Sequence, residues 1–199
     1  MKMLTISWED VQAHLLALSE KIERDGYAPD MIVGVARGGW VAARILSDLL
    51  GVSDLATMKI SFYKGIDETE KRPTITQPVS ESPRGRKVLI VDDVADSGES
   101  LLLAKSHIAD NGACSIRTAT IHMKPWSKMV PDFYIASTDS WIIYPWEVRE
   151  AISNLSRIWG KEANDAGTLK ARLISAGIPE GMVSRYVPDG SARSQCMNE

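Results

Sequence analysis

The first apolar residues of the chain recur at helical spacing. The S-x-x-D motif from Ser7 to Asp10 is a helix start signal, and Gly26 lies where the periodicity stops. Between these points the apolar positions repeat every three to four residues: Val11, Leu15, Leu18 and Ile22. The spacing predicts an amphipathic helix over 8–24.

A strand followed by a helix is then predicted twice. The continuous apolar run 31–35 is bounded by Pro29 and by Arg37-Gly38-Gly39, which is typical of a buried strand, and two apolar rows at helical spacing predict a helix over 40–50. The same order returns as a strand over 87–91, a polar turn and a helix over 99–111. Further strands are expected at 55–62, 115–123 and 133–137. Strands that alternate with helices predict a parallel α/β sheet, whose ligands bind beyond the carboxyl ends of the strands.

The remaining segments are less regular. Residues 64–86 are polar and contain three prolines, and they predict a loop or a small hairpin, either a solvated excursion or a flap over an active site. Apolar periodicity predicts helices over 148–159, 167–176 and 179–187. We expect a main domain over 1–150, a helical extension over 151–190 that packs on the core or at a subunit interface, and a flexible tail over 191–199.

Composition and charge exclude several classes of protein. The 199 residues are 44% hydrophobic and 25% charged, which excludes disordered, collagenous and disulfide-scaffold chains. The net charge of −3 offers no general field for nucleic acid or an anionic membrane, so neither partner is expected. The two cysteines, Cys114 and Cys196, have no metal-ligand spacing, and no apolar run approaches the about 20 residues of a membrane span. A cytoplasmic location is expected.

Three carboxylates lie within five positions directly after the apolar run 87–91. Because this is the expected ligand edge, the cluster indicates binding chemistry rather than an ordinary capped turn. Paired carboxylates accept hydrogen bonds from sugar hydroxyls or hold a hydrated Mg²⁺, and small residues at a helix N-terminus bind phosphate. The sequence therefore predicts a site for a phosphorylated ribose, with these residues: Asp92, Asp93, Asp96, Ser97, Gly98 and Ser100.

The stretch from Val88 to Leu101 resembles the phosphoribosyl-pyrophosphate motif of type I phosphoribosyltransferases. The resemblance covers about 3–148 and fades beyond Glu150. It implies the fold of that family, a central mostly parallel sheet flanked by helices with a flexible loop, here followed by a small C-terminal helical extension. A receiver domain also ends a strand in paired aspartates that bind Mg²⁺, but it would place them near its N-terminus.

The resemblance also implies which residues bind phosphoribosyl pyrophosphate. They are Arg37, Gly38, Gly39, Asp92, Asp93, Val94, Ala95, Asp96, Ser97, Gly98, Glu99 and Ser100. The first three correspond to the loop that binds the pyrophosphate, where a cis peptide bond between Ala36 and Arg37 is expected. Glu99 is tolerable only if its side chain turns away while its backbone amide serves the phosphate.

Two further segments resemble the base-binding region of xanthine-guanine and hypoxanthine phosphoribosyltransferases. These are Lys124-Pro125 and the stretch 139–147. On this resemblance Lys124 donates to the 6-oxo group of a purine, Trp141 stacks on the base, and the backbone at Ile142 contacts the purine edge. Such a site prefers 6-oxopurines over adenine. The alternatives are a core role for Trp141 and a surface role for Lys124. The other five tryptophans are assigned to packing.

The expected reaction is transfer of 5-phosphoribose from phosphoribosyl pyrophosphate to nitrogen 9 of hypoxanthine, guanine or xanthine. Mg²⁺ is the implied cofactor, with Asp93 on the metal side, Asp92 on the ribose hydroxyls, and Asp96 as the base that takes the proton from nitrogen 7. The relatives are usually dimers or tetramers, so a homodimer or homotetramer is expected. The alternative is a regulator that senses phosphoribosyl pyrophosphate. A helix-turn-helix at 167–187 is disfavoured because its basic residues are few: Lys170, Arg172 and Arg185.

Overall fold

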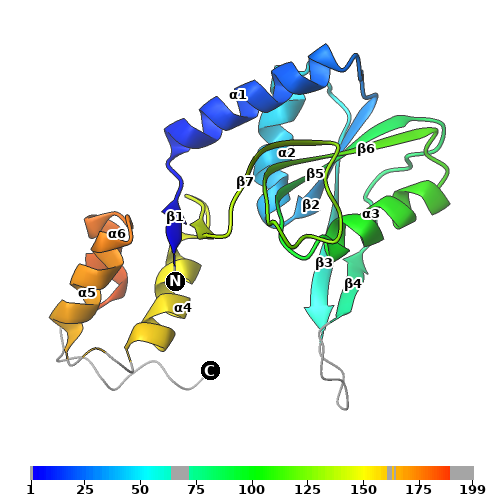
Figure 1. Cartoon of the computed structure of the whole chain (residues 1–199). Helices are drawn as coiled ribbons and strands as arrows, with labels where there is room; N and C mark the ends of the chain where they lie inside the picture. Colours follow the sequence, from blue (N-terminus) through cyan, green and yellow to red (C-terminus); the bar gives the residue numbers. More distant parts are fainter. Residues whose placement is uncertain (1, 64–71, 161–162, 164, 189–199) are drawn as a thin grey trace. The chain divides into compact units, whose positions relative to one another are not determined.

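The chain forms two compact units. The computed structural model describes residues 2–63, 72–160, 163 and 165–188. The central unit comprises Val11–Asp139, and the terminal unit joins Met1–Asp10 to Ser140–Glu199. Most elements of both units are labelled in Figure 1.

The central unit is built on a six-stranded sheet with the order β4-β3-β2-β5-β6-β7. Every neighbouring pair is parallel except β3 with β4, so the predicted mostly parallel α/β sheet is confirmed. The strand order reverses between β2 and β5. The strands are β2 (Met31–Ala36), β3 (Leu55–Tyr63), β4 (Arg72–Gln77), β5 (Lys87–Ala95), β6 (Ser115–Met123) and β7 (Phe133–Ser137).

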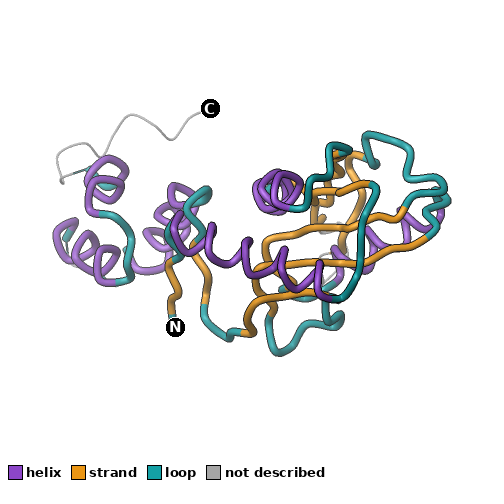
Figure 2. The backbone as a smooth tube through the Cα atoms, turned by 90° about the horizontal axis from the view of Figure 1, so that it is seen from above, coloured by secondary structure: helices purple, strands orange, loops and turns teal. Residues whose placement is uncertain are grey.

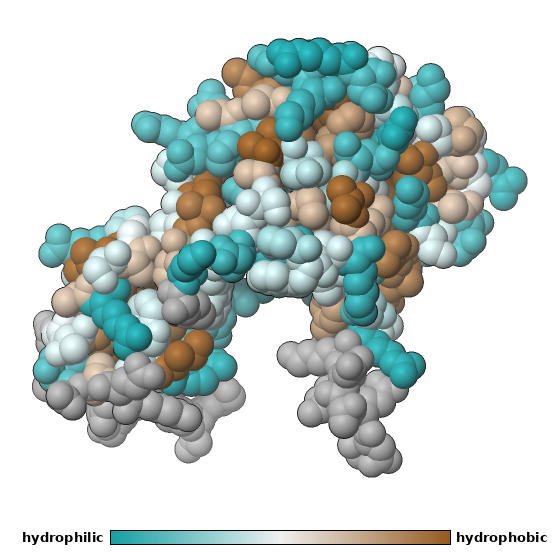
Figure 3. All heavy atoms as spheres, in the orientation of Figure 1, coloured by the Kyte–Doolittle hydropathy of each residue, from teal (hydrophilic) through white to brown (hydrophobic). Residues whose placement is uncertain are grey.

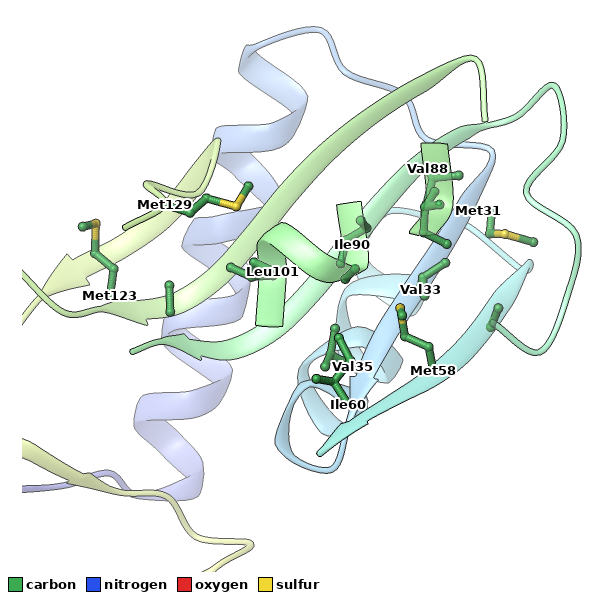
Figure 4. Close-up of a cluster of buried hydrophobic side chains, with 14 residues drawn as sticks. Met31, Val33, Val35, Met58, Ile60, Val88, Ile90, Leu101, Met123 and Met129 are labelled. Atoms are coloured by element: carbon green, nitrogen blue, oxygen red, sulfur yellow. The ribbon is translucent and has the colours of Figure 1, made fainter. Parts of the chain in front are cut away.

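Helices cover both faces of this sheet. One face packs against α3 (Glu99–Asp110) in a cluster whose members Figure 4 labels, among them Val33, Ile90 and Leu101. Gly34 points to the other face, where a Cβ atom would lie 2.9 Å from Cβ of Ala43 in α2 (Gly38–Leu49). Because neighbouring residues of a strand face opposite sides, α2 and α3 lie on opposite faces. The course of these helices and strands can be followed in Figure 2.

Helix α1 (Trp8–Arg24) begins at the predicted capping motif. The Asp10 amide donates to Oγ of Ser7 at 3.0 Å, and the Ser7 amide donates to Oδ2 of Asp10 at 2.9 Å. The predicted apolar stripe is fully buried: Val11, Leu15, Leu18 and Ile22. Further along the helix, the ring of His14 meets that of His122 in β6 edge to face, with centroids 5.4 Å apart.

Two expected boundaries are wrong, one by four residues and one by two. Strand β5 continues past residue 91 to Ala95, because its pairing with β6 runs on through Asp92 opposite Thr120 and Ala95 opposite Met123. Helix α2 begins at Gly38 instead of residue 40. The two aspartates therefore lie within a paired strand, and both glycines of the 37–39 motif lie in the first turn of a helix.

Part of the segment 64–86 forms the small hairpin that was one of its two expected structures. Strand β4 pairs antiparallel with β3, with Phe62 opposite Pro73 and Ile60 opposite Ile75. Residues 64–71 lie outside the described residues, and the prediction of a closing flap falls largely on them.

The terminal unit combines a two-stranded parallel sheet with three helices. Strands β1 (Met3–Thr5) and β8 (Trp141–Ile143) pair with each other, while α4 (Val148–Trp159), α5 (Ala166–Ser175) and α6 (Glu180–Tyr186) lie close to their predicted ranges. Residues of β8 and of the three helices share one core, which includes Ile143, Leu155, Leu173 and Val183. The two strands were not predicted, because three residues are too few for a periodic pattern.

The surface has no broad apolar region on the face shown in Figure 3. Its hydrophobic areas are small and separated by hydrophilic ones. Single exposed apolar residues of this kind need no partner. Within the described ranges, no helix is long and apolar enough to cross a membrane.

Candidate functional site

The candidate site lies where the strand order of the central sheet reverses. In open α/β sheets this crevice, beyond the carboxyl ends of the strands, is where ligands bind. Strand β2 ends directly before Arg37, β5 ends before Asp96, and β6 ends before Lys124. Because β2, β5 and β6 are neighbours and run parallel, three segments that are far apart in sequence begin at one edge of the sheet.

A pocket of about 140 Å³ is formed by the turn between β5 and α3. Its wall contains nine residues, eight of them from the motif found in the sequence: Phe62, Asp92, Val94, Ala95, Asp96, Ser97, Gly98, Ser100 and Leu101. Helix α3 starts at Glu99, so its positive dipole end lies beside this turn, and the Glu99 amide donates to Oγ of Ser97 at 3.3 Å. Such a pocket suits a phosphate group.

Gly98 allows the turn to close against the segment that follows β6. Its φ is +78°, a left-handed conformation that favours glycine. A Cβ atom there would lie 2.6 Å from Oγ of Ser127 and 2.7 Å from the amide nitrogen of Met129. The shape of the pocket therefore depends on glycine at this position.

The paired carboxylates lie against the first turn of α2. A Cβ atom on Gly38 would overlap the Asp93 carboxylate, and one on Gly39 would lie 2.7 Å from Cα of Asp92. The Gly39 amide also donates to Asp92, which favours its charged form. Burial, and then the neighbouring charge of Asp93, outweigh this bond and raise the pKa of Asp92 well above its usual range. The two motifs predicted to bind one ligand are thus in direct contact.

Arg37 directly precedes the first turn of α2 and is exposed. The peptide bond between Ala36 and Arg37 is cis, as predicted. The Arg37 side chain is exposed at the edge of the crevice, next to the helix N-terminus that begins at Gly38. A guanidinium beside the positive dipole end of a helix suits a diphosphate.

The paired carboxylates fit a Mg²⁺ site that a substrate would complete. The described residues hold no cluster of three or more histidine, cysteine or acidic side chains suited to a metal ion. Mg²⁺ is usually bound by one or two carboxylates together with substrate phosphates and waters, rather than by a full set of protein ligands. Asp92 and Asp93 beside the 37–39 turn provide that kind of partial donor set.

Lys124 is held at the end of β6 next to β5. Its amide donates to the carbonyl oxygen of Ala95 at 2.9 Å, and the residue is only 6% exposed. Burial lowers the pKa of Lys124, while the negative charges of Asp96 and Asp139 oppose that shift. The surface role considered for this lysine is therefore wrong.

The residues after Lys124 contact the turn between β5 and α3, which we call the phosphate turn. The indole nitrogen of Trp126 donates to Oδ1 of Asp96 at 3.0 Å, and Nζ of Lys128 pairs with Oε1 of Glu99 at 2.5 Å. The Glu99 carboxylate is thus turned to a cation rather than simply to solvent. The assignment of Trp126 to packing is wrong, because this residue is 57% exposed and its polar atom faces the site.

Trp141 and Ile142 belong to the terminal unit. Both lie in β8, where Trp141 is opposite Met3 and Ile142 is opposite Leu4. Trp141 is half-buried and packs against the core shared by α4, α5 and α6. The predicted purine-binding residues are thus divided between the units, with Lys124 in the central one.

Sequence reasoning missed three residues around the pocket: Phe62, Trp126 and Lys128. Phe62 could have been found from its place near the carboxyl end of a predicted strand, at the ligand edge. The other two lie in a turn that carries no periodicity, so only their distance of a few residues from Lys124 pointed to the site.

Comparisons with known proteins agree with this geometry. Residues 7–152 match the model of the phosphoribosyl transferase domain family. A xanthine-guanine phosphoribosyltransferase of Cereibacter sphaeroides is 32% identical over 151 aligned residues, and the match covers 72% of this chain and 86% of the relative.

Solved structures of similar proteins share the fold. A purine phosphoribosyltransferase of Pyrococcus horikoshii is 38% identical with a TM-score of 0.67, covering 73% of this chain and 94% of that one. A hypothetical protein of Neisseria gonorrhoeae with bound ppGpp is 26% identical with a TM-score of 0.67, covering 89% of this chain and 98% of that one. With the family model, these relatives show that the chain belongs to the phosphoribosyltransferase family and is an enzyme of its purine phosphoribosyltransferase group.

Proposed function

We propose that this enzyme transfers 5-phosphoribose from phosphoribosyl pyrophosphate to nitrogen 9 of a 6-oxopurine, releasing pyrophosphate and a nucleoside monophosphate. The observation that carries the proposal is the direct contact between the paired carboxylates of β5 and the first turn of α2, beside the pocket of the 96–100 turn. A phosphate, a diol and a diphosphate are the three polar parts of phosphoribosyl pyrophosphate. This edge of the sheet offers one suitable group of residues for each part.

Each part of the donor has a proposed partner. The 5-phosphate occupies the pocket at the start of α3, and Asp92 accepts hydrogen bonds from the ribose hydroxyls. The diphosphate lies at the start of α2 beside Arg37, where the guanidinium and helix dipole stabilise the negative charge of the leaving group. Asp93, with Asp92 next to it, would hold Mg²⁺. The ion, when bound, neutralises part of the charge that develops on pyrophosphate.

The acceptor base is proposed to lie beside Lys124. The ammonium donates to the 6-oxo oxygen. Stacking of Trp141 on the base and contact of the Ile142 backbone with its edge stay predictions from the resemblance. Adenine carries an amino group at position 6, so a donor would face a donor and leave a buried polar group unpaired. Support comes from the burial of Lys124 and from its place beside Asp96, since a lysine held there has its donors at the ligand edge.

Asp96 is the proposed general base. It lies one residue beyond the end of β5 and is exposed at the pocket wall. The Trp126 side chain contacts both Asp96 and Lys124. Taking the proton from nitrogen 7 of the base as the bond to nitrogen 9 forms prevents positive charge from building on the purine.

The test is a spectrophotometric assay of the full chain with phosphoribosyl pyrophosphate and Mg²⁺. Hypoxanthine, guanine, xanthine, adenine and uracil are offered in parallel. We expect turnover of at least one 6-oxopurine and none of adenine. Turnover of adenine alone, or of uracil, would overturn the assignment of the acceptor, and it would do so without affecting the family.

A second candidate function follows from one neighbour. The Neisseria gonorrhoeae protein was solved with bound ppGpp, and it covers 89% of this chain, including most of the terminal unit. We propose that ppGpp, a guanine nucleotide with diphosphate groups, competes with phosphoribosyl pyrophosphate here. Inhibition that excess phosphoribosyl pyrophosphate relieves supports this. Tight ppGpp binding by a protein inactive on all five bases would instead favour the ligand-sensing regulator considered from the sequence.

The homodimer or homotetramer expected from the resemblance stays a prediction. Light scattering coupled to size-exclusion chromatography measures the mass in solution, and a monomeric mass of about 21.9 kDa would contradict it.

A further inference from the structure

Trp126 touches two groups that the proposed reaction uses. It is 57% exposed, so its indole is not part of a packed core. Its Nε1–H donates to Oδ1 of Asp96 at 3.0 Å, and the ammonium of Lys124 lies 5.6 Å from its ring centroid. One side chain therefore contacts both the proposed general base and the proposed ligand of the 6-oxo group.

The hydrogen bond restricts the Asp96 carboxylate. An exposed aspartate samples several side-chain rotamers, and a base that removes a proton must present one oxygen in one direction. With Oδ1 engaged by the indole, only those rotamers of the carboxylate that keep this bond are favoured. Such a bond acts on the orientation of the base and leaves the binding of phosphoribosyl pyrophosphate to other residues.

The ring face supports Lys124 without neutralising it. The aromatic face attracts the ammonium charge, in addition to the negative charges of Asp96 and Asp139 that act on Lys124. The 6% exposure of Lys124 means that little water competes with the ring.

The backbone on both sides of Trp126 is tied to β5 and the phosphate turn. The Lys124 amide donates to the Ala95 carbonyl at 2.9 Å, and the Lys128 amide donates to the Ser97 carbonyl at 2.9 Å. Within the turn, the Ser127 amide donates to the Lys124 carbonyl at 3.0 Å. These bonds hold the indole at a set distance from Asp96, so the contact belongs to the ordered backbone of the turn.

We infer that Trp126 is a positioning residue for the transfer reaction, which orients Asp96 through its indole N–H and holds Lys124 against its ring. The inference rests on the proposed function. It adds a residue that acts through two others and touches neither substrate.

The experiment compares Trp126→Phe with Trp8→Phe. The control residue, Trp8, is equally exposed, at 57%. It belongs to the terminal unit, whereas the pocket residues belong to the central unit. Phenylalanine keeps an aromatic face for Lys124 but removes the N–H donor. We expect kcat of Trp126→Phe to fall by about 10-fold, as for loss of one hydrogen bond to a charged group, with KM for phosphoribosyl pyrophosphate within about 3-fold of wild type. Trp8→Phe should match the wild type.

A second arm tests that the effect passes through Asp96. In the Asp96→Asn background, adding Trp126→Phe should lower kcat by less than about 2-fold, because a base that no longer takes the proton gains nothing from orientation. An unchanged kcat for Trp126→Phe in an active enzyme, or full additivity with Asp96→Asn, would overturn the inference. Either result would leave the proposed function standing.

A readout that needs no turnover separates the two proposals. The indole N–H resonance of Trp126, assigned by its loss in Trp126→Phe, should shift in Asp96→Asn while that of Trp8 stays in place. If this shift occurs and the wild type turns over none of the bases, the proposed function fails and the hydrogen bond stands. If the resonance does not move, the positioning role is wrong whatever the activity.

Discussion

Asp96 is the residue on which the proposed proton transfer depends. It lies at the wall of the phosphate pocket, but its side chain accepts a hydrogen bond from Trp126 and faces the Lys124 side of the turn. This position suits proton transfer from the purine better than binding of phosphoribosyl pyrophosphate. In the proposed complex the 97–100 turn binds the phosphate instead.

We expect Asp96→Asn to lower kcat by about 100-fold or more while the affinity for phosphoribosyl pyrophosphate changes by only a few-fold. Asparagine keeps the size and the hydrogen-bond acceptor but cannot take a proton, and general-base catalysis contributes about 10²- to 10⁴-fold. Steady-state kinetics measure kcat, and isothermal titration with phosphoribosyl pyrophosphate measures the binding. Loss of donor binding with little change in kcat would contradict the role.

Glu99 shows how one residue can look unsuitable in the sequence and be accommodated by the fold. A carboxylate in a phosphate turn repels the ligand, but here Lys128 from the segment after β6 pairs with it. The pair is partly exposed, so its contribution to stability is small. Its effect is local, because it offsets a negative charge beside the pocket.

At the scale of elements, the turn between β5 and α3 has its shape because Gly98 is pressed against the 127–129 segment. Left-handed backbone and lack of space act together at this position. Three described glycines have only the first property: Gly26, Gly51 and Gly85. Gly26 has a φ of +75° with nothing within 4 Å of a Cβ atom.

This difference predicts that Gly98→Ala costs more than Gly26→Ala. The control should lose about 1 kcal/mol of unfolding free energy from its left-handed backbone alone. Gly98→Ala adds a clash with Ser127 and Met129, so we expect a loss of about 2–3 kcal/mol together with weaker binding of phosphoribosyl pyrophosphate. Urea unfolding and titration measure the two effects. Equal losses in both variants would show that the close approach is unimportant.

Helix α5 is held to the terminal unit mainly by its buried face. Leu173 is fully buried in the core shared with α4, α6 and β8, whereas its neighbour Ile174 is 40% exposed. The two residues have similar volume and hydrophobicity and lie in the same helix, so they form a matched pair.

We expect Leu173→Ala to lower the unfolding free energy of the terminal unit by about 2–5 kcal/mol, because it removes buried methyl groups and leaves a cavity. Ile174→Ala should change it by less than about 1 kcal/mol. Urea unfolding followed by tryptophan fluorescence measures the loss, since two of the six tryptophans, Trp141 and Trp159, belong to this core or pack against it. Similar effects of both substitutions would mean that α5 is not packed through this face.

At the scale of the whole molecule, buried titratable groups make stability depend on pH. His122 in β6 is 2% exposed, and burial, His14 and Lys124 together lower the pKa of His122 to about 4. The unfolded chain takes up this proton near the ordinary histidine pKa of about 6.5. Between about pH 6.5 and 4 the unfolded state therefore binds more protons than the folded one, and stability falls as pH falls.

The expected loss from His122 is on the order of 3 kcal/mol across this window. The raised pKa of Asp92 acts in the opposite direction, since a folded state that holds that proton gains stability as pH falls. Comparing the wild type with His122→Gln isolates the histidine. We expect the unfolding free energy of the variant to fall less between pH 7 and 4.5 than that of the wild type. Parallel curves would show that His122 does not titrate differently in the folded state.

The sequence by itself determined the α/β class, the positions of most strands and helices, and the two motifs of the donor site. Each of these depends on local physics: apolar periodicity for the elements, and small or acidic residues beside a predicted strand end for the motifs. Ser7 with Asp10, and the helices over 148–159 and 179–187, could be predicted for the same reason.

Tertiary structure decided what depends on neighbours distant in sequence. Strand β5 runs on to Ala95 because β6 pairs with it, and β1 and β8 are strands only because each pairs with the other. The contact of Gly38 with Asp93 follows from the strand order, and the exposed position of Trp126 beside Asp96 follows from the turn after β6. Local sequence carries no information on such pairings, because their energy comes from hydrogen bonds and packing between segments that meet only in the folded chain.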